Sequence, residues 1–169
     1  MGTISETKID YTIHPRVNSS DPVAPRPRPL VPAHIVSSDA EAIEIAERLA
    51  EKFKSGAALR DREGLLPVSE LDEYSQSGLW SLNVPKAYGG PEVSYATLAK
   101  VIAIIAAADP AIAQTTQNHL AITATVDLDG TEEQRKLFFG WALQGLRYGN
   151  AFSELKSKTV ADFETRVVH

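Results

Sequence analysis

The sequence contains no cysteine, which excludes disulfide bonds, thiolate metal sites and cysteine nucleophiles. It also lacks a long apolar run, because the longest one, residues 101–108, is far too short to span a bilayer. Residues 1–10 do not join a charged segment to an apolar one, as secretory signals do. We therefore expect a cytoplasmic protein with no metal site and no membrane partner.

The chain has fewer basic than acidic side chains. The chain has 17 lysine and arginine residues against 22 aspartate and glutamate residues, and its formal net charge is -5. A protein that neutralises nucleic-acid phosphates needs a dense basic face, which is missing here. The glycine-rich patterns of nucleotide-binding loops are missing as well. We therefore expect small molecules and protein surfaces as partners, and no nucleic acid.

Proline is concentrated near the amino terminus. Between residues 12 and 32 stand Pro15, Pro22, Pro25, Pro27, Pro29 and Pro32. Proline removes a backbone donor and biases the residue before it away from helix. We interpret residues 1–37 as an extended arm, solvated or laid over a neighbouring subunit, and assign it no activity. Its PxxP spacing, with Arg26 and Arg28, would also suit a polyproline ligand.

Helical patterns begin after the arm. Ser38 and Glu41 have the spacing of a capping box, which predicts a helix over about residues 39–59. A short second helix is predicted over about residues 68–77. Residues 83–91 then place two prolines and two adjacent glycines around a tyrosine, a composition that cannot continue a helix. We expect a shaped loop there.

Two apolar helices joined by a tight corner are predicted next. Ser94 can cap a helix over residues 95–108. Asp109 can cap the following one, with Pro110 at its first position. The second helix, over about residues 110–126, has few charges and should be the central helix of the bundle.

The last helical pattern starts with a second capping box, Thr131 with Gln134. It predicts an amphipathic helix to about residue 143, ended by Gly145. Its inward face is predicted from three large apolar side chains, Leu137, Phe138 and Trp141.

The pattern changes to that of strands near the carboxyl end. Residues 148–153 have strand composition, and residues 163–168 alternate with period two. We expect a sheet to begin here, in the amino-terminal part of a longer polypeptide, because an unpaired terminal strand is an aggregation hazard. The predicted organisation is an arm over residues 1–37, a helical domain over 38–145 and the start of a β domain over 146–169.

Three stretches occur together in one order and spacing: GLWSLNVPKAYGG at residues 78–90, GTEEQRKLFF at 130–139 and YGNAFSE at 148–154. In this arrangement they resemble the amino-terminal helical domain of acyl-CoA dehydrogenases where it leads into the middle sheet domain. The resemblance covers residue 40 to the end. It implies a mainly α fold, with that helical domain followed by the first strands of a truncated β domain.

One branch of this superfamily is the better match. Dehydrogenases carry Thr-Glu-Pro and then Gly-Ser-Asp on the first strand, whereas residues 153–155 here are Ser-Glu-Leu and residues 158–160 are Lys-Thr-Val. With Gly-Asn-Ala at residues 149–151, this resembles the sulfur-acquisition and dibenzothiophene monooxygenase branch. That branch uses reduced FMN, supplied by a separate flavin reductase, and oxygen.

The resemblance implies an oxidoreductase that oxidises a small organosulfur compound through a flavin hydroperoxide, usually as a homotetramer. Two alternatives stay open: an acyl-CoA dehydrogenase that uses FAD, and a helical interaction module without catalysis. Because the superfamily builds its flavin site from all its domains, we expect these 169 residues alone to be inactive and to bind flavin weakly.

The resemblance also implies the site residues. Asn150 matches an amide beside the flavin, Ser153 a hydroxyl at its N5 and O4 edge, and Phe152 a backbone contact. Thr159 is a weaker match to a phosphate-binding serine. His119, on the central helix, matches a histidine that exchanges a proton with the flavin adduct.

Each of these side chains also has a structural interpretation. A lone histidine on an apolar helix is commonly a hydrogen-bonded core residue. An asparagine at the end of a strand can bond neighbouring backbone, and a serine within a strand carries little information by itself. Without the resemblance we would favour the structural role for His119.

Overall fold

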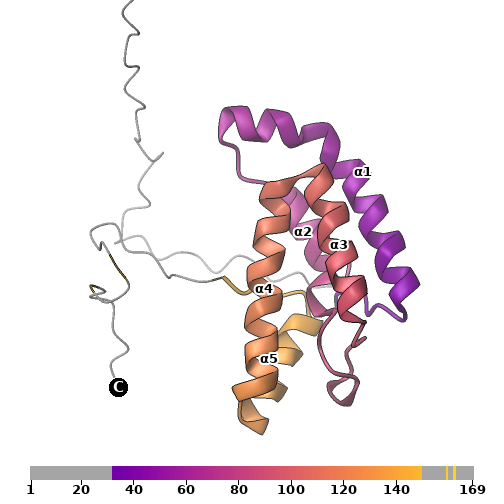
Figure 1. The fold of residues 1–169 in the computed structure, drawn as a ribbon, viewed down its shortest axis with the longest axis vertical. Helices are drawn as coiled ribbons and strands as arrows, with labels where there is room; N and C mark the ends of the chain where they lie inside the picture. Colours follow the sequence, from indigo (N-terminus) through magenta and orange to yellow (C-terminus); the bar gives the residue numbers. More distant parts are fainter. Residues whose placement is uncertain (1–31, 150–158, 160–161, 163–169) are drawn as a thin grey trace, which may run out of the picture. The chain divides into compact units, whose positions relative to one another are not determined.

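The computed structural model describes residues 32–149, together with residues 159 and 162. Figure 1 shows that the described part is a bundle of helices. Its elements are α1 (Asp39–Glu63), α2 (Val68–Gln76), the short 3-10 helices η1 (Leu79–Ser81) and η2 (Lys86–Tyr88), α3 (Tyr95–Ala108), α4 (Pro110–Asp129) and α5 (Glu132–Leu143). This confirms the predicted helical amino-terminal domain. None of the described helices has the length and apolar content needed to cross a bilayer.

The bundle is held by a continuous apolar core. Helix α3 lies between α1 and α4, and α5 packs along the carboxyl half of α4 (Figure 1). Fully buried members of the core include Phe53, Tyr74, Trp80, Ile105 and Ile112. Burial of each such side chain contributes about 1.5–3 kcal/mol, so the sheet that the strand patterns predict is not needed to give this domain a core. Of these patterns, residues 148 and 149 are described and are not in a strand, and the remainder, residues 150–153 and 163–168, lies outside the described residues.

The predicted helix boundaries are confirmed, except that α1 and α4 end later than predicted. Helix α4 ends at Asp129 rather than at about residue 126. Helix α1 continues past residue 59 to Glu63, where Gly64 in the left-handed conformation ends it (φ 62°). Its amino end carries only half of the predicted capping box: Ser38 accepts the Glu41 N–H at 3.1 Å. The Glu41 carboxylate turns instead to Ser37, from whose N–H (2.6 Å) and hydroxyl it accepts. These bonds lower the pKa of Glu41 to about 2.

The inward face of α5 differs from the prediction. Phe139 and Ala142 are the buried residues, whereas Leu137 is 48% exposed. Phe139 packs with Val84 and Tyr88 of the loop after η1. That loop brings its own apolar side chains to α5, and their position decides which of the two adjacent phenylalanines turns inward.

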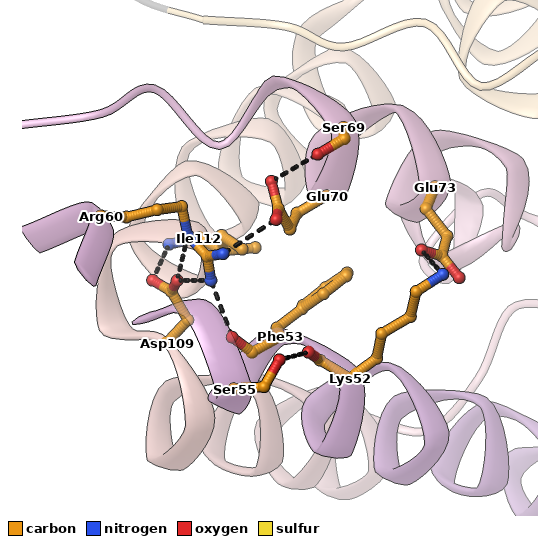
Figure 2. Close-up of polar contacts among 9 residues, drawn as sticks. All are labelled: Lys52, Phe53, Ser55, Arg60, Ser69, Glu70, Glu73, Asp109 and Ile112. Carbon is orange, nitrogen blue, oxygen red and sulfur yellow. Dashed lines mark hydrogen bonds and ion pairs between the residues drawn. The ribbon is translucent and has the colours of Figure 1, made fainter. Parts of the chain in front are cut away.

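Arg60 joins three parts of the bundle (Figure 2). Its guanidinium donates to the Asp109 carboxylate at 2.7 Å, to Glu70 of α2 at 2.8 Å and to the Phe53 carbonyl of its own helix at 2.8 Å. Its side chain is only 13% exposed. The other oxygen of Asp109 accepts the N–H groups of Ala111 and Ile112, the first orphan donors of α4. One carboxylate therefore caps α4 and pairs with α1.

Gly56 allows Arg60 to reach back over its own helix. A Cβ at Gly56 would lie 2.3 Å from Nη1 of Arg60, a separation that no real pair of atoms tolerates. Glycine within a helix is unfavourable by about 1 kcal/mol relative to alanine. The contacts of Arg60 with Asp109, Glu70 and Phe53 are what this glycine makes room for.

We expect Arg60→Met to lower the free energy of unfolding by about 3 kcal/mol, because Asp109 and Glu70 would lose their buried partner. The measurement is urea denaturation followed by circular dichroism. Arg62→Met is the matched control, since Arg62 is exposed and pairs only with its neighbour Glu63. The control should change stability by less than about 0.5 kcal/mol. Equal losses in the two variants would contradict the role of Arg60.

Gly56→Ala should destabilise the protein despite the higher helix propensity of alanine, because the new methyl group displaces the Arg60 guanidinium. In an Arg60→Met background the sign should reverse, and the same substitution should stabilise by up to about 1 kcal/mol. A double-mutant cycle in urea measures both values. If Gly56→Ala stabilised the protein in both backgrounds, the contacts of Arg60 would not depend on the missing side chain at Gly56.

Candidate functional site

His119 lies at the centre of the candidate site. It is on α4, in the row of buried residues that also contains Thr116, Leu120 and Thr123, and no part of it is exposed. A buried imidazole needs a partner for each ring nitrogen, because an unsatisfied polar atom in the core costs about 1–3 kcal/mol. The contacts of its two nitrogens therefore define what the side chain can do.

Both ring nitrogens of His119 bond to backbone groups. The N–H of Tyr148 donates to Nδ1 at 3.0 Å, so Nδ1 must be unprotonated. Nε2 lies 2.7 Å from the Trp80 carbonyl oxygen, which can only accept, so Nε2 must carry the proton. The geometry thus fixes a single neutral tautomer. The imidazole links η1 to the segment that follows α5.

Two aromatic rings pack against the imidazole. Tyr148 stacks on it almost in parallel, with centroids 4.8 Å apart and an interplanar angle of 8°. Trp80 lies at 4.8 Å in a tilted arrangement, and its indole N–H donates to Ser75 at 3.0 Å. The hydroxyl of Thr123 donates to the His119 carbonyl at 2.9 Å. These neighbours are neutral, so they give a protonated imidazole no counter-charge.

Burial lowers the pKa of His119 from 6.5 to about 4, against a smaller opposing effect of the bond to Trp80. The side chain is therefore neutral at pH 7. Proton transfer through Nε2 requires that its bond to the Trp80 carbonyl opens first. The proton-transfer role of His119 stays a prediction.

The three sequence stretches that carry the family resemblance meet around this histidine. The first supplies Trp80, and also Asn83, whose amide donates to the Leu120 carbonyl of α4 at 2.9 Å. The second supplies Phe138, and the third supplies Tyr148. The first and third motifs thus contact His119 directly, and the second reaches it only through Tyr148.

Only part of the predicted site lies within the described residues. Asn150, Phe152 and Ser153 lie outside them, and their assignment stays a prediction. Tyr148, which contacts His119, stands two residues before Asn150 in the sequence. Trp80 and Tyr148 were not assigned as site residues from the sequence, although both stand inside the recognised motifs. They bond to His119 through backbone atoms, which leave no sequence signal.

The surroundings of Thr159 are described only locally. Both its N–H, at 3.1 Å, and its hydroxyl, at 2.9 Å, donate to the carboxylate of Asp162. A phosphate group that used the same donors would have to displace this carboxylate. The phosphate-binding role of Thr159 stays a prediction.

A hollow of about 440 Å³ lies at the amino end of α4, away from His119 along the helix. Arg60, Asp61, Leu65, Pro67 and Asp109 are among its lining residues. The guanidinium of Arg60 already donates to the carboxylates of Asp109 and Glu70. The hollow therefore offers a ligand mostly apolar contacts.

The comparison with protein families finds one domain. Residues 40–145 match the acyl-CoA dehydrogenase N-terminal domain. The match begins at the first turn of α1 and ends just after α5, so it contains every described helix.

Curated relatives and solved structures agree with this match. Dibenzothiophene monooxygenase of Rhodococcus erythropolis is 34% identical over 131 residues, which are 77% of this chain and 31% of that protein. The probable FMNH2-dependent monooxygenase SfnC of Pseudomonas putida is 35% identical over 120 residues, 70% of this chain and 30% of that protein. The chain thus spans about a third of the length of these relatives.

Two solved structures share the fold. Methanesulfinate monooxygenase MsuC from Pseudomonas fluorescens matches 69% of this chain and 30% of its own, with 32% identity and a TM-score of 0.62. FMN-bound TdsC from Paenibacillus sp. A11-2 matches 60% of this chain and 26% of its own, with 31% identity and a TM-score of 0.56.

The lowered pKa of His119 predicts how stability depends on pH. In the unfolded chain the imidazole of His119 has a pKa of 6.5, whereas in the folded protein its pKa is about 4. The free energy of unfolding should therefore fall as the pH drops from 6.5 towards 4. The total loss should be about 3 kcal/mol. Urea denaturation at several pH values measures it. His119→Gln should flatten the curve in this range. The same slope in wild type and His119→Gln would contradict the assignment.

Proposed function

The chain belongs to the acyl-CoA dehydrogenase family through its amino-terminal domain, and on that basis we propose that the protein is a reduced-FMN monooxygenase acting on a small organosulfur compound. One observation carries the proposal: about 70% or more of the chain aligns, at above 30% identity, with proteins named as dibenzothiophene and FMNH2-dependent monooxygenases. The substrate class is that of these relatives, whose names specify dibenzothiophene and methanesulfinate.

The chemistry of the candidate residues fits a flavin. The amide of Asn150, the hydroxyl of Ser153 and the backbone of Phe152 are neutral hydrogen-bonding groups of the kind that the edge of a flavin ring uses. Tyr148, two residues before Asn150 in the sequence, packs against the neutral imidazole of His119.

Reduced FMN, when bound, supplies the two electrons for a reaction that transfers one atom of O2 to the substrate and releases the other as water. In the proposal, residues of this chain bind and orient the flavin. Asn150 and Ser153 hold the ring by hydrogen bonds, and Thr159 contributes on the phosphate side once its donors leave Asp162. In the proposal His119 is uncharged and adds no positive charge to the site. A proton passes through its Nε2 only when the hydrogen bond to the Trp80 carbonyl opens.

The wider setting is part of the same proposal. A separate flavin reductase delivers the reduced FMN. The reaction takes place in the cytoplasm and in a homotetramer, as in the branch that the sequence resembles.

An FAD-dependent acyl-CoA dehydrogenase is the second candidate, and the family description of residues 40–145 favours it. It would remove a proton and a hydride from a thioester and pass electrons to an acceptor. Oxygenation of an organosulfur substrate that depends on reduced FMN belongs to the first candidate only. Reduction of an artificial acceptor that depends on acyl-CoA belongs to the second.

We expect the intact protein, supplied with FMN, a flavin reductase and NADH, to consume oxygen and to oxygenate one of a panel of thiophenes, sulfones and alkanesulfinates. Mass spectrometry with ¹⁸O2 should find one labelled atom in the product. Asn150→Ala and Ser153→Ala should each lower kcat/KM about tenfold or more, because each removes a hydrogen bond to the flavin. Ser55→Ala, at an exposed serine of α1, is the control. Acyl-CoA-dependent acceptor reduction without product oxygenation would overturn the proposal.

A further inference from the structure

Exposed apolar side chains gather where α1 is joined to α2. Among the residues that the structure describes, eight large apolar side chains are exposed, and four of them lie between residues 59 and 68: Leu59, Leu65, Leu66 and Val68. The other four are scattered over residue 35, α3, α4 and α5. We call residues 59, 65, 66 and 68 the α1–α2 patch. A cluster of exposed apolar side chains marks a contact with another surface.

The patch lies beside the hollow at the amino end of α4. Figure 1 shows the end of α1 at the same end of the bundle as the corner between α3 and α4. Leu65 lines the hollow, which has a volume of about 440 Å³, and Pro67, Pro110 and Ala111 are among its other apolar walls. Leu66 is 80% exposed. A projecting leucine therefore stands directly next to an apolar hollow that is large enough to receive one.

The backbone holds Leu66 in a fixed position. Gly64 ends α1 in the left-handed conformation (φ 62°), and the N–H of Leu65 donates to the Arg60 carbonyl at 2.9 Å. The N–H of Val68 donates to the Leu66 carbonyl at 2.9 Å and closes the turn between them. A side chain on a restrained backbone loses less conformational entropy on association than one on a free loop. Leu66 is thus ready for insertion into an apolar hollow.

The charges around the patch are of both signs. Residues 60–63 alternate arginine with an acidic residue. Within this run Arg62 and Glu63 pair with each other at 2.9 Å, and their side chains are 70% and 53% exposed. A strongly acidic or strongly basic partner would oppose one of these two charges with a like charge. Two copies related by a twofold axis can instead set Arg62 of each against Glu63 of the other. Charge complementarity therefore favours a second copy of this chain.

From these features we propose that the α1–α2 patch is a twofold contact between two copies of this chain, in which Leu66 of each copy enters the hollow of the other. In such a contact each surface must carry both halves of the fit, here the projecting leucine and the hollow beside it. The leucines form the buried apolar centre, and Arg62 and Glu63 belong to the polar rim. The contact goes beyond the proposed oxygenation and needs no flavin.

Cross-linking between two differently tagged copies tests this contact in the intact protein. One copy carries Leu66→Cys, and the other carries Ala111→Cys on the wall of the hollow. The two are expressed together and treated with a short bismaleimide. We expect a covalent dimer that carries both tags. The control replaces Leu66→Cys by Leu128→Cys, because Leu128 is 78% exposed but lies at the opposite end of α4 from the hollow. The control pair should give no such dimer.

Substitution by a charge tests the strength of the contact. Leu66→Asp would place a carboxylate inside an apolar hollow, so the dissociation constant of the contact should rise about thirtyfold or more. Leu128→Asp, at an equally exposed leucine, should leave it unchanged. Sedimentation velocity over a dilution series measures both constants. Circular dichroism establishes that each variant is folded, which is expected because both leucines are exposed.

Equal yields of the doubly tagged dimer from the test pair and the control pair would overturn the proposal. So would equal dissociation constants for Leu66→Asp and Leu128→Asp. A Leu66→Cys thiol that is protected from maleimide in a protein that does not cross-link would assign the hollow to another part of the polypeptide, and a freely reactive thiol would show that nothing covers it. Both results exclude the twofold contact. A protein that cross-links as expected but does not oxygenate with reduced FMN would overturn the proposed function alone.

Discussion

The described structure is organised around one imidazole that bonds to backbone on both sides. His119 joins the Trp80 carbonyl, 39 residues before it, to the Tyr148 N–H, 29 residues after it. Neither partner can exchange roles, since a carbonyl only accepts and an amide N–H only donates. A neutral imidazole with its proton on Nε2 meets both requirements from one side chain. The loop region before α3 and the segment after α5 are placed relative to each other through it.

Local sequence rules predicted most of the helical domain. The corner at Asp109 and Pro110 and the capping box of Thr131 with Gln134 are confirmed, because a cap depends on residues within one turn of itself. The errors arise where residues outside the helix decide. Glu41 turns to Ser37 and His34 rather than back to Ser38. The inward face of α5 depends on Tyr88 and Val84, which no periodicity within the helix can reveal.

The candidate site shows the same division. Its motifs were sufficient to identify the family, because they preserve residue types at fixed spacing. The contacts of His119 could not be predicted, because the groups that bond to it belong to the backbone and are common to every residue type. Its surroundings also decide its chemistry: the same histidine on an exposed face would titrate near 6.5, whereas neutral rings and burial hold it uncharged.

The carboxylate of Asp109 has an evolutionary consequence. One oxygen caps α4 and would do so in any related protein that starts a helix here, with serine, threonine or asparagine as adequate replacements. The other oxygen serves Arg60 alone. Among homologues, positions 60 and 109 should therefore covary asymmetrically: a neutral cap at position 109 is compatible with a basic residue at position 60, which still pairs with Glu70, whereas loss of the basic residue should be found together with a neutral cap.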